Sequence, residues 1–227
     1  MEVTRKINEN SQQMEESLRA IRTNIKFCGE NIKTICFTSV YPNEGKSTVV
    51  LKLAESFAKS GNKVLVVDTD MRKSQMVGRN RFHTTNQTPI VGLSQYLSGQ
   101  NSLEEVVYQY QNLSLIFAGH MVANATELLE KKFFSILMER AKEKFDYVLV
   151  DCAPTSAAID VAIVAKSCDG VVFVVEQNKV SPKELEGAKK QMEASGTKVL
   201  GAVLNKVKTE HNAYSYYYRI YGENNEK

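Results

Sequence analysis

Short apolar runs alternate with helical patterns along most of the chain, from residue 33 to residue 205. This alternation is typical of parallel strands joined by crossover helices. It predicts an α/β protein with a doubly wound, mainly parallel sheet and helices on both faces. The predicted strands are TICFTS at 34–39, KVLVVD at 63–68, LSLIFAG at 113–119, YVLVD at 147–151, GVVFVVE at 170–176 and KVLGAVLN at 198–205. The helical patterns include 126–144, 156–167 and 181–195, the last with Ser181 and Pro182 as N-cap and first helical residue.

An amphipathic helix is predicted before this core, over residues 11–28. Its apolar residues recur at three- and four-residue spacing on one face: Met14, Leu18, Ile21 and Ile25. Three charged residues lie to one side of that stripe: Glu16, Arg19 and Arg22. Glu16 and Arg19 are three residues apart, so they could simply form an exposed ion pair that stabilises the helix by ~0.2–0.5 kcal/mol. Alternatively, the charged side of the helix could contact another subunit.

The chain ends in a tyrosine-rich segment that follows the last predicted strand. Five of the ten tyrosines fall in it: Tyr214, Tyr216, Tyr217, Tyr218 and Tyr221. The segment has neither helical nor clean alternating spacing, so we predict a mobile tail over 206–227 after a single domain spanning 1–205. A structural alternative stays open, because Tyr214, Tyr216 and Tyr218 alternate and tyrosine favours pairing at the edge of a sheet.

A phosphate-binding loop is predicted at VYPNEGKST, residues 40–48. Gly45, Lys46 and Ser47 match the second half of the G-x-x-x-x-G-K-[ST] pattern. In that pattern, backbone N–H groups and the lysine hold phosphate, and the hydroxyl binds Mg²⁺. The first glycine of the pattern is missing, because Val40 stands in its place.

The context of this loop nevertheless favours nucleotide binding. A predicted strand precedes the loop, and a helical pattern that stops near Gly61 follows it. Asn43 tolerates a positive φ better than most residues, so it could hold a turn whose amides still point inward. The residues expected to contact nucleotide from this loop are Asn43, Glu44, Gly45, Lys46, Ser47 and Thr48.

Three carboxylates follow predicted strands, at the edge of the sheet where the phosphate loop lies: Asp68, Asp70 and Asp151. A single aspartate at a strand end more often caps a helix or forms a turn. Three of them beside a phosphate loop predict a Mg²⁺ site, because Mg²⁺ combines one or two carboxylates with nucleotide phosphates. The remaining carboxylate is a candidate general base for an attacking hydroxyl group.

The composition argues against several other classes of protein. A net charge of +3 in 227 residues is too small to indicate a nucleic-acid partner. No apolar run approaches the ~20 residues that span a bilayer, and no secretion signal is recognised, so we expect a cytosolic location unless a partner holds the chain at a membrane. One basic run is interpreted as a solvated face: Arg72, Lys73, Arg79 and Arg81. The cysteines lack metal-ligand spacing and are expected to be buried thiols: Cys28, Cys36, Cys152 and Cys168.

Three of these segments resemble the Walker A, Walker A′ and Walker B motifs of bacterial tyrosine kinases of the capsule and exopolysaccharide type: SVYPNEGKST, VVDTDMR and VLVDCAP. GLSQYLSG and ATELLEKKFF match the middle section of that family, so the resemblance covers nearly the whole chain. Glu16, Arg19 and Arg22 fit its E-x-x-R-x-x-R oligomerisation motif, and the terminal tyrosines fit its autophosphorylated cluster. The resemblance implies a P-loop NTPase type of fold and an ATP-dependent protein tyrosine kinase in the control of polysaccharide assembly.

The resemblance also implies roles for individual residues. Lys46 and Ser47 would bind the phosphates of ATP and Mg²⁺. Three carboxylates would complete the catalytic and metal site, with Asp68 preferred as the base: Asp68, Asp70 and Asp151. Asn205 matches a family position near the adenine, and the tail tyrosines would accept phosphate from a neighbouring subunit in a ring. The expected partners are protein substrates and a membrane-anchored activator of the polysaccharide co-polymerase type, which would recruit this cytoplasmic kinase to the inner face of the cell membrane.

The segment HMVANAT at 120–126 lacks the prolines that are common before ELL in this family, and two single positions also depart from the family pattern. Asn43 replaces a glycine, and Ala153 replaces the first of two prolines after Walker B, but neither change removes a charged catalytic group. The main alternative is an ATPase switch of the partitioning or septum-positioning kind without kinase activity, which shares the fold and the aspartate motifs. That class carries a lysine early in its loop, where this chain has Tyr41, and it has no need of a tyrosine-rich end.

Overall fold

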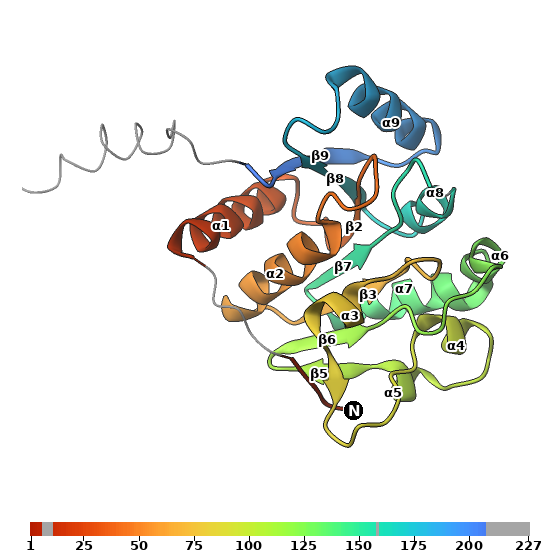
Figure 1. The fold of residues 1–227 in the computed structure, drawn as a ribbon. Coiled ribbons are helices and arrows are strands. Elements are labelled where there is room, and N and C mark those ends of the chain that lie inside the picture. Colours follow the sequence, from red (N-terminus) through yellow and green to blue (C-terminus); the bar gives the residue numbers. More distant parts are fainter. Residues whose placement is uncertain (6–10, 158, 208–227) are drawn as a thin grey trace, which may run out of the picture.

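The fold is described from a computed structural model of the chain, which covers residues 1–5, 11–157 and 159–207. The tail tyrosines at 214–221 therefore lie outside the described residues. The described part holds one main sheet of seven strands in the order β5-β6-β3-β7-β2-β8-β9, together with a two-stranded ribbon of β1 and β4 (Figure 1). The strands are β1 Val3–Thr4, β2 Thr34–Thr38, β3 Val64–Asp68, β4 His83–Thr84, β5 Tyr108–Tyr110, β6 Leu113–Ile116, β7 Tyr147–Asp151, β8 Gly170–Glu176 and β9 Val199–Asn205.

The main sheet is parallel except at one edge, where β5 pairs with β6 in the antiparallel sense. From β2 the chain runs outward to β3 on one side, and it later returns through β7 to reach β8 on the other side. The order therefore reverses at β2, and ligands of such sheets bind beyond the carboxyl ends of the strands at this reversal. The prediction of a doubly wound, mainly parallel sheet is confirmed.

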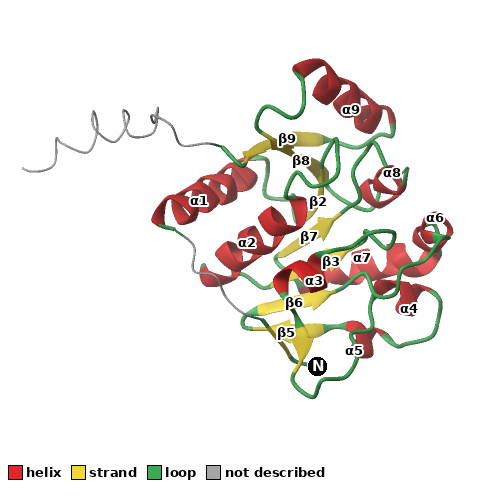
Figure 2. Ribbon diagram, viewed as in Figure 1, coloured by secondary structure: helices red, strands yellow, loops and turns green. Residues whose placement is uncertain are grey.

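Helices cover both faces of the sheet, as Figure 2 shows. The helices α1, α2 and α3 pack with one buried cluster, and the helices from α4 to α9 pack with a second cluster on the opposite face. Two apolar clusters on either side of one sheet explain why the inner strands are buried along nearly their whole length, whereas the edge strand β9 is half-buried to exposed. The helices are α1 Gln12–Phe27, α2 Lys46–Lys59, α3 Met76–Asn80, α4 Leu93–Leu97, α5 Leu103–Val106, α6 Ala125–Leu129, α7 Lys132–Lys144, α8 Asp160–Ala165 and α9 Pro182–Ala194.

Several element boundaries differ from the prediction, two of them because of hydrogen bonds to distant segments. The strand expected over 113–119 ends at Ile116, because the carbonyls of Phe117 and Ala118 accept hydrogen bonds from the start of α4 instead of from a strand. The helix expected over 126–144 is two helices, α6 and α7. The helix expected over 156–167 begins only at Asp160, because residues 155–156 donate backbone hydrogen bonds to residues 39–40 of the phosphate loop.

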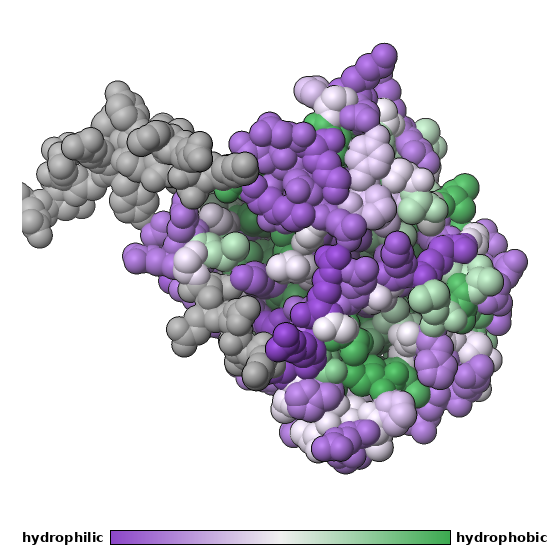
Figure 3. Space-filling view, viewed as in Figure 1, coloured by the Kyte–Doolittle hydropathy of each residue, from purple (hydrophilic) through white to green (hydrophobic). Residues whose placement is uncertain are grey.

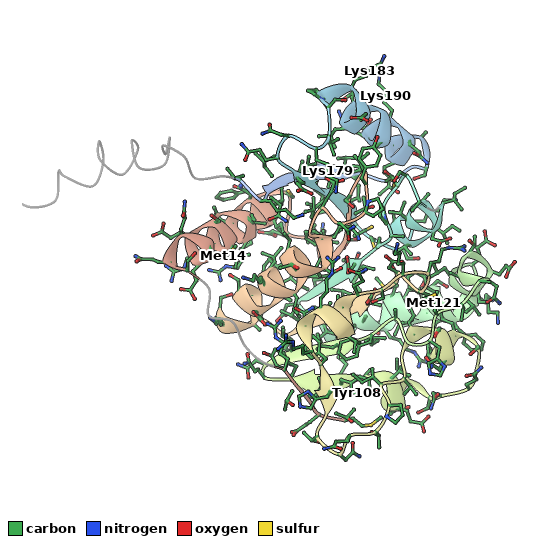
Figure 4. The ribbon with its side chains drawn as sticks, viewed as in Figure 1. Met14, Tyr108, Met121, Lys179, Lys183 and Lys190 are labelled. Atoms are coloured by element: carbon green, nitrogen blue, oxygen red, sulfur yellow. The ribbon has the colours of Figure 1, made fainter. Side chains whose placement is uncertain are left out.

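The predicted N-terminal helix is present as α1, which begins after the N-cap Ser11 and packs on α2. Leu18 and Ile25 are buried, whereas Met14, labelled in Figure 4, is largely exposed at the start of the helix. Arg22 donates from Nη1 to the backbone oxygen of Ser56 in α2, at 2.7 Å. Part of the charged side of α1 therefore stabilises the fold of this chain itself.

The four cysteines are free thiols, and two of them lie deep in the core. Cys36 in β2 and Cys152 after β7 are both fully buried, with their Sγ atoms 3.0 Å apart. Cys28 and Cys168 are half-buried, so the expectation of buried thiols is confirmed for two of the four. Within the described residues, none of the helices combines the length and the apolar character needed to cross a membrane.

Candidate active site

The phosphate loop joins β2 to α2 at the point where the strand order reverses. Gly45 is the N-cap of α2 and has a φ of 91°, in the left-handed region. A Cβ at this position would lie 2.2 Å from Nδ2 of Asn205, so only glycine fits. Asn43 has a φ of 66°, which confirms that asparagine holds a left-handed turn where the family has glycine.

Lys46 and Ser47 open α2, where helix amides and the helix dipole favour bound phosphate. Lys46 is only 8% exposed, and its charge acts on the nearby carboxylate of Asp151. The hydroxyl of Ser47 lies close enough to the same carboxylate to lower its pKa. The structure thus brings the loop and the β7 carboxylate together, as the sequence predicted.

Asp68 and Asp151 end neighbouring strands in direct register, Asp68 on β3 and Asp151 on β7. Both are almost completely buried. Ser74 donates to one carboxylate oxygen of Asp68, and the backbone N–H of Asp70 donates to the other at 3.1 Å. Asp70 lies beside this pair, half-buried, with its own carboxylate accepting from the backbone N–H of Lys73. The three predicted carboxylates therefore converge on one edge of the sheet.

Burial and mutual repulsion change the acidity of this pair. Burial, followed by the negative charge of Asp151, raises the pKa of Asp68 to about 8, against the opposing hydrogen bond from Ser74. Burial also raises the pKa of Asp151, while Lys46 and Ser47 act to lower it. A raised pKa makes the ionised carboxylate a stronger base, so Asp68 is suited to take a proton from an attacking hydroxyl group once it has lost its own.

The residues present fit a magnesium ion. Oδ1 of Asp151 is buried and has no hydrogen-bond partner, which is costly for a carboxylate oxygen unless a cation or a ligand satisfies it. Within the described part of the chain, no three His, Cys, Asp or Glu side chains cluster closely enough to bind a metal by themselves. Such an arrangement matches Mg²⁺, which is usually held by one or two carboxylates together with nucleotide phosphates and water.

A cleft of about 290 Å³ lies over the phosphate loop, and Asp70 is the predicted carboxylate that lines it. Its walls include loop residues 42–48 except Glu44, together with Asp70 and residues 153–154. Three members of the basic run also line it: Arg72, Lys73 and Arg79. Lys73, Arg79 and Arg81 are exposed, as a solvated face requires, whereas the prediction is wrong for Arg72, which is half-buried and pairs with the buried Asp160.

Several residues of the site were not identified from the sequence. Ser74, which contacts Asp68, could have been found, because it lies only six residues after it on the same loop. Arg79 donates from Nη2 to Oδ1 of Asn43 at 2.8 Å, and this contact depends on how α3 folds back over the loop. Asn205, which the resemblance placed near the adenine, donates from Nδ2 to the backbone oxygen of Glu44 at 2.8 Å.

Comparison with known proteins shows the family to which this chain belongs. Residues 32–211 match a family model described as an AAA domain. Tyrosine-protein kinase CpsD from Streptococcus agalactiae is 40% identical over 205 residues, which cover 89% of this chain and 88% of CpsD. Tyrosine-protein kinase YwqD from Bacillus subtilis is 34% identical over 207 residues, which cover 89% of this chain and 85% of YwqD.

Solved structures give the same result. The chimerical protein CapA2B2 has a TM-score of 0.79 at 30% identity, covering 87% of this chain and 86% of that one. The kinase domain of the Escherichia coli tyrosine kinase ETK has a TM-score of 0.77 at 28% identity, covering 88% of this chain and 79% of that domain. The cell division ATPase MinD from Pyrococcus furiosus, with a TM-score of 0.61 at 23% identity over 76% of this chain and 71% of its own, shares the fold alone. The phosphate loop, the paired aspartates and these similarities together place the chain in the family of bacterial tyrosine-protein kinases that includes CpsD and YwqD.

Proposed function

We propose that this protein is a Mg²⁺- and ATP-dependent protein tyrosine kinase that phosphorylates its own tail and other proteins in the control of capsular or exopolysaccharide synthesis. The observation that carries the proposal is the convergence of Lys46 with the buried pair Asp68 and Asp151 beside one cleft. The acceptor tyrosines of the tail would be Tyr214, Tyr216, Tyr217, Tyr218 and Tyr221.

The proposal gives separate tasks to the residues of the site. The loop amides and Lys46 bind and orient the ATP phosphates. Asp68 accepts the proton of the tyrosine hydroxyl as its oxygen bonds to the γ-phosphorus and the bond to the β–γ bridging oxygen breaks, releasing ADP. Magnesium, when bound, neutralises charge on the phosphates, and Ser47, Asp70 and Asp151 are the side chains placed to hold it with Asp68 nearby.

The decisive experiment is to incubate the purified protein with ATP and Mg²⁺ and to locate phosphate by mass spectrometry. Phosphotyrosine in the tail of the native chain, and its loss in Lys46→Met, is the expected result. Removing the lysine should cost on the order of hundredfold or more in rate, as loss of a charge-stabilising group at a reacting centre does. ATP hydrolysis without any phosphotyrosine, measured with the cytosolic segment of an activator present, would instead favour the ATPase-switch alternative.

A membrane-anchored activator of the polysaccharide co-polymerase type is the proposed partner, and it would recruit the cytoplasmic kinase to the inner face of the membrane. The structural similarity to the chimerical protein CapA2B2 supports the choice of this partner class. Co-sedimentation with membranes that do or do not contain the activator would test it, because recruitment predicts pelleting only when the activator is present.

We propose that each subunit of a ring transfers phosphate to the tail tyrosines of its neighbour. The 16 residues from Asn205 to Tyr221 could extend roughly 50 Å, which is enough to reach an adjacent site. A head-to-tail arrangement of subunits presents each tail to the next site and closes into a ring. Mixing Lys46→Met chains that keep their tails with active chains truncated after Lys208 tests this route, because only transfer between chains can label the inactive chain.

The charged side of α1 is the proposed ring contact, through Glu16, Arg19 and Arg22. Since Arg22 already binds the backbone oxygen of Ser56 within the chain, the three residues are not equivalent. Arg19→Ala should shift the sedimenting species toward monomer without lowering the melting temperature. Arg22→Ala should also lower the melting temperature. Equal effects of both variants on assembly and stability would contradict the proposal that Arg19 acts only between subunits while Arg22 also stabilises the chain itself.

A further inference from the structure

Glu44 is a carboxylate of the phosphate loop that is fully buried and does not line the cleft. Its Oε1 accepts from the backbone N–H of Tyr41 at 2.5 Å, within the same loop. Its Oε2 accepts from the backbone N–H of Glu176 at 2.9 Å, at the end of β8. The side chain therefore joins the phosphate loop to a neighbouring strand.

Three consecutive carbonyls of the loop are each bound by a side chain that comes from the ends of β8 and β9. Nζ of Lys179 donates to the oxygen of Pro42 at 2.7 Å, and Nζ of Lys206 donates to the oxygen of Asn43 at 2.7 Å. Nδ2 of Asn205 donates to the oxygen of Glu44 at 2.8 Å. The carbonyls of residues 42–44 are thus held toward the β8–β9 side of the loop.

Glu176 connects the two lysines of this set. Its Oε2 accepts from Nζ of Lys206 at 3.0 Å and from Nζ of Lys179 at 3.2 Å. Register explains the convergence, because Glu176 and Asn205 are direct partners in the parallel pair β8–β9. Figure 3 shows hydrophilic residues gathered over the loop that joins β8 to α9, and Lys179, labelled in Figure 4, comes from this loop.

The orientation of these carbonyls fixes the orientation of the loop amides. In a trans peptide the C=O of one residue and the N–H of the next point in opposite directions. Carbonyls of residues 42–44 that point to β8 and β9 therefore turn the N–H groups of residues 43–45 the other way, toward the cleft. Successive N–H groups pointing into one concavity bind anions.

We propose that Glu44, Glu176, Lys179 and Lys206 are positioning residues that lock the phosphate-binding amides of the loop in place, and that none of them is a ligand of the nucleotide through its side chain. Val40 and Asn43 stand at loop positions where glycine is usual. The contacts of these four side chains would hold the backbone of the loop in the phosphate-binding orientation. The proposal rests on the binding of phosphate by this loop, which is one part of the proposed function, and it does not depend on transfer to tyrosine.

The first test is Glu44→Gln, measured by the affinity for a fluorescent ADP with Mg²⁺ and by competition with inorganic pyrophosphate. Glutamine has one acceptor oxygen, so its amide NH₂ must face one of the two backbone N–H groups that Glu44 satisfies. We expect both ligands to bind at least about tenfold more weakly, because a buried donor is left unpaired. The matched control is Glu186→Gln on α9, whose carboxylate contacts only exposed lysines, and it should bind like the native protein.

Two lysine variants test the proposal independently of whether Glu44→Gln folds. The side chains of Lys179 and Lys206 are 33% and 47% exposed, so Lys179→Met and Lys206→Met are tolerable substitutions. Each should weaken pyrophosphate binding about three- to tenfold and raise the KM for ATP while kcat at saturation stays close to native. Lys206→Arg, which keeps a donor, should recover most of the affinity. Native affinity in both methionine variants would overturn the proposal, even in a protein that phosphorylates no tyrosine.

Discussion

Two sets of buried carboxylates lie at the same edge of the sheet, and they are paired very differently. Asp160, at the start of α8, accepts from Nε of Arg72 at 2.7 Å and from Oγ1 of Thr126 at 2.6 Å. Asp68 and Asp151, on β3 and β7, face one another without a paired arginine, and Oδ1 of Asp151 has no partner. Asp160 is satisfied by a paired arginine and a hydroxyl group, whereas Asp68 is held by hydrogen bonds alone and Asp151 keeps one oxygen without a partner.

This difference separates a structural carboxylate from a reactive one better than burial does. Asp68, Asp151 and Asp160 are all at most 3% exposed. A buried charge without pairing is unfavourable in a folded protein, so it persists where a ligand, a cation or a proton compensates it. We therefore assign the Asp68–Asp151 pair, which has no paired arginine and leaves Oδ1 of Asp151 without a partner, to chemistry, and Asp160 to holding the loop after β3 against α6 and α8.

The largest expected effect comes from Asp68→Asn. Asparagine is nearly isosteric, but it cannot accept the proton of a tyrosine hydroxyl, so the turnover should fall about 10²- to 10⁴-fold. The affinity for ADP should change far less, because the phosphate loop is intact. Rapid-quench measurement of phosphotyrosine, with nucleotide titration as the control, would check this. A variant with near-native turnover would exclude Asp68 as the base.

The same substitution should stabilise the ligand-free protein at high pH. The pKa of Asp68 is about 8 in the folded chain, compared with about 3.9 for an unperturbed aspartate. Between these values the folded state keeps a proton that the unfolded state has lost, so the free energy of unfolding falls as pH rises and levels off above pH 8. Thermal unfolding of Asp68→Asn should therefore match the native protein near pH 4 and exceed it by several degrees at pH 8. A constant difference across this range would contradict the raised pKa.

Asp160→Asn should show the opposite profile, with a moderate loss of stability and a small loss of activity. The amide weakens the contact with the partly exposed Arg72 and leaves polar groups poorly paired, which typically costs about 1–3 kcal/mol. Urea unfolding measures this loss, and the turnover should stay far above that of Asp68→Asn. A variant with native stability and greatly reduced turnover would place Asp160 among the reactive carboxylates instead.

The smallest effect is expected for Tyr41→Phe. The hydroxyl of Tyr41 donates to Glu184 on α9 at 2.5 Å, and this contact lies at the surface, where water can replace either partner. We expect no resolvable change in melting temperature and less than about a twofold change in nucleotide affinity, since the loop backbone is held through Glu44 and not through this side chain. A larger loss would show that the loop is also held through α9.

The sequence by itself determined six of the strands, the phosphate loop and the position of two aspartates at strand ends, but not the short strands β1, β4 and β5. Runs such as 64–68 and 147–151 are apolar and β-branched, and Asp68 and Asp151 follow from the rule that the carboxyl ends of parallel strands meet at one edge. Gly45 and Lys46 could be recognised because a phosphate loop needs its residues within a few positions of each other. These features depend on near neighbours in the chain, and local spacing records them directly.

Only the tertiary structure decided which side chains hold the phosphate loop where glycine is missing, and where some helices and strands begin and end. The bonds from Lys179, Asn205 and Lys206 to residues 42–44 join parts of the chain separated by more than 130 residues. The start of α8 at Asp160 and the end of β6 at Ile116 were likewise set by bonds to distant segments. Such contacts arise from the order and register of the strands, which bring the ends of β2, β8 and β9 together, and no periodicity within a single segment encodes that order.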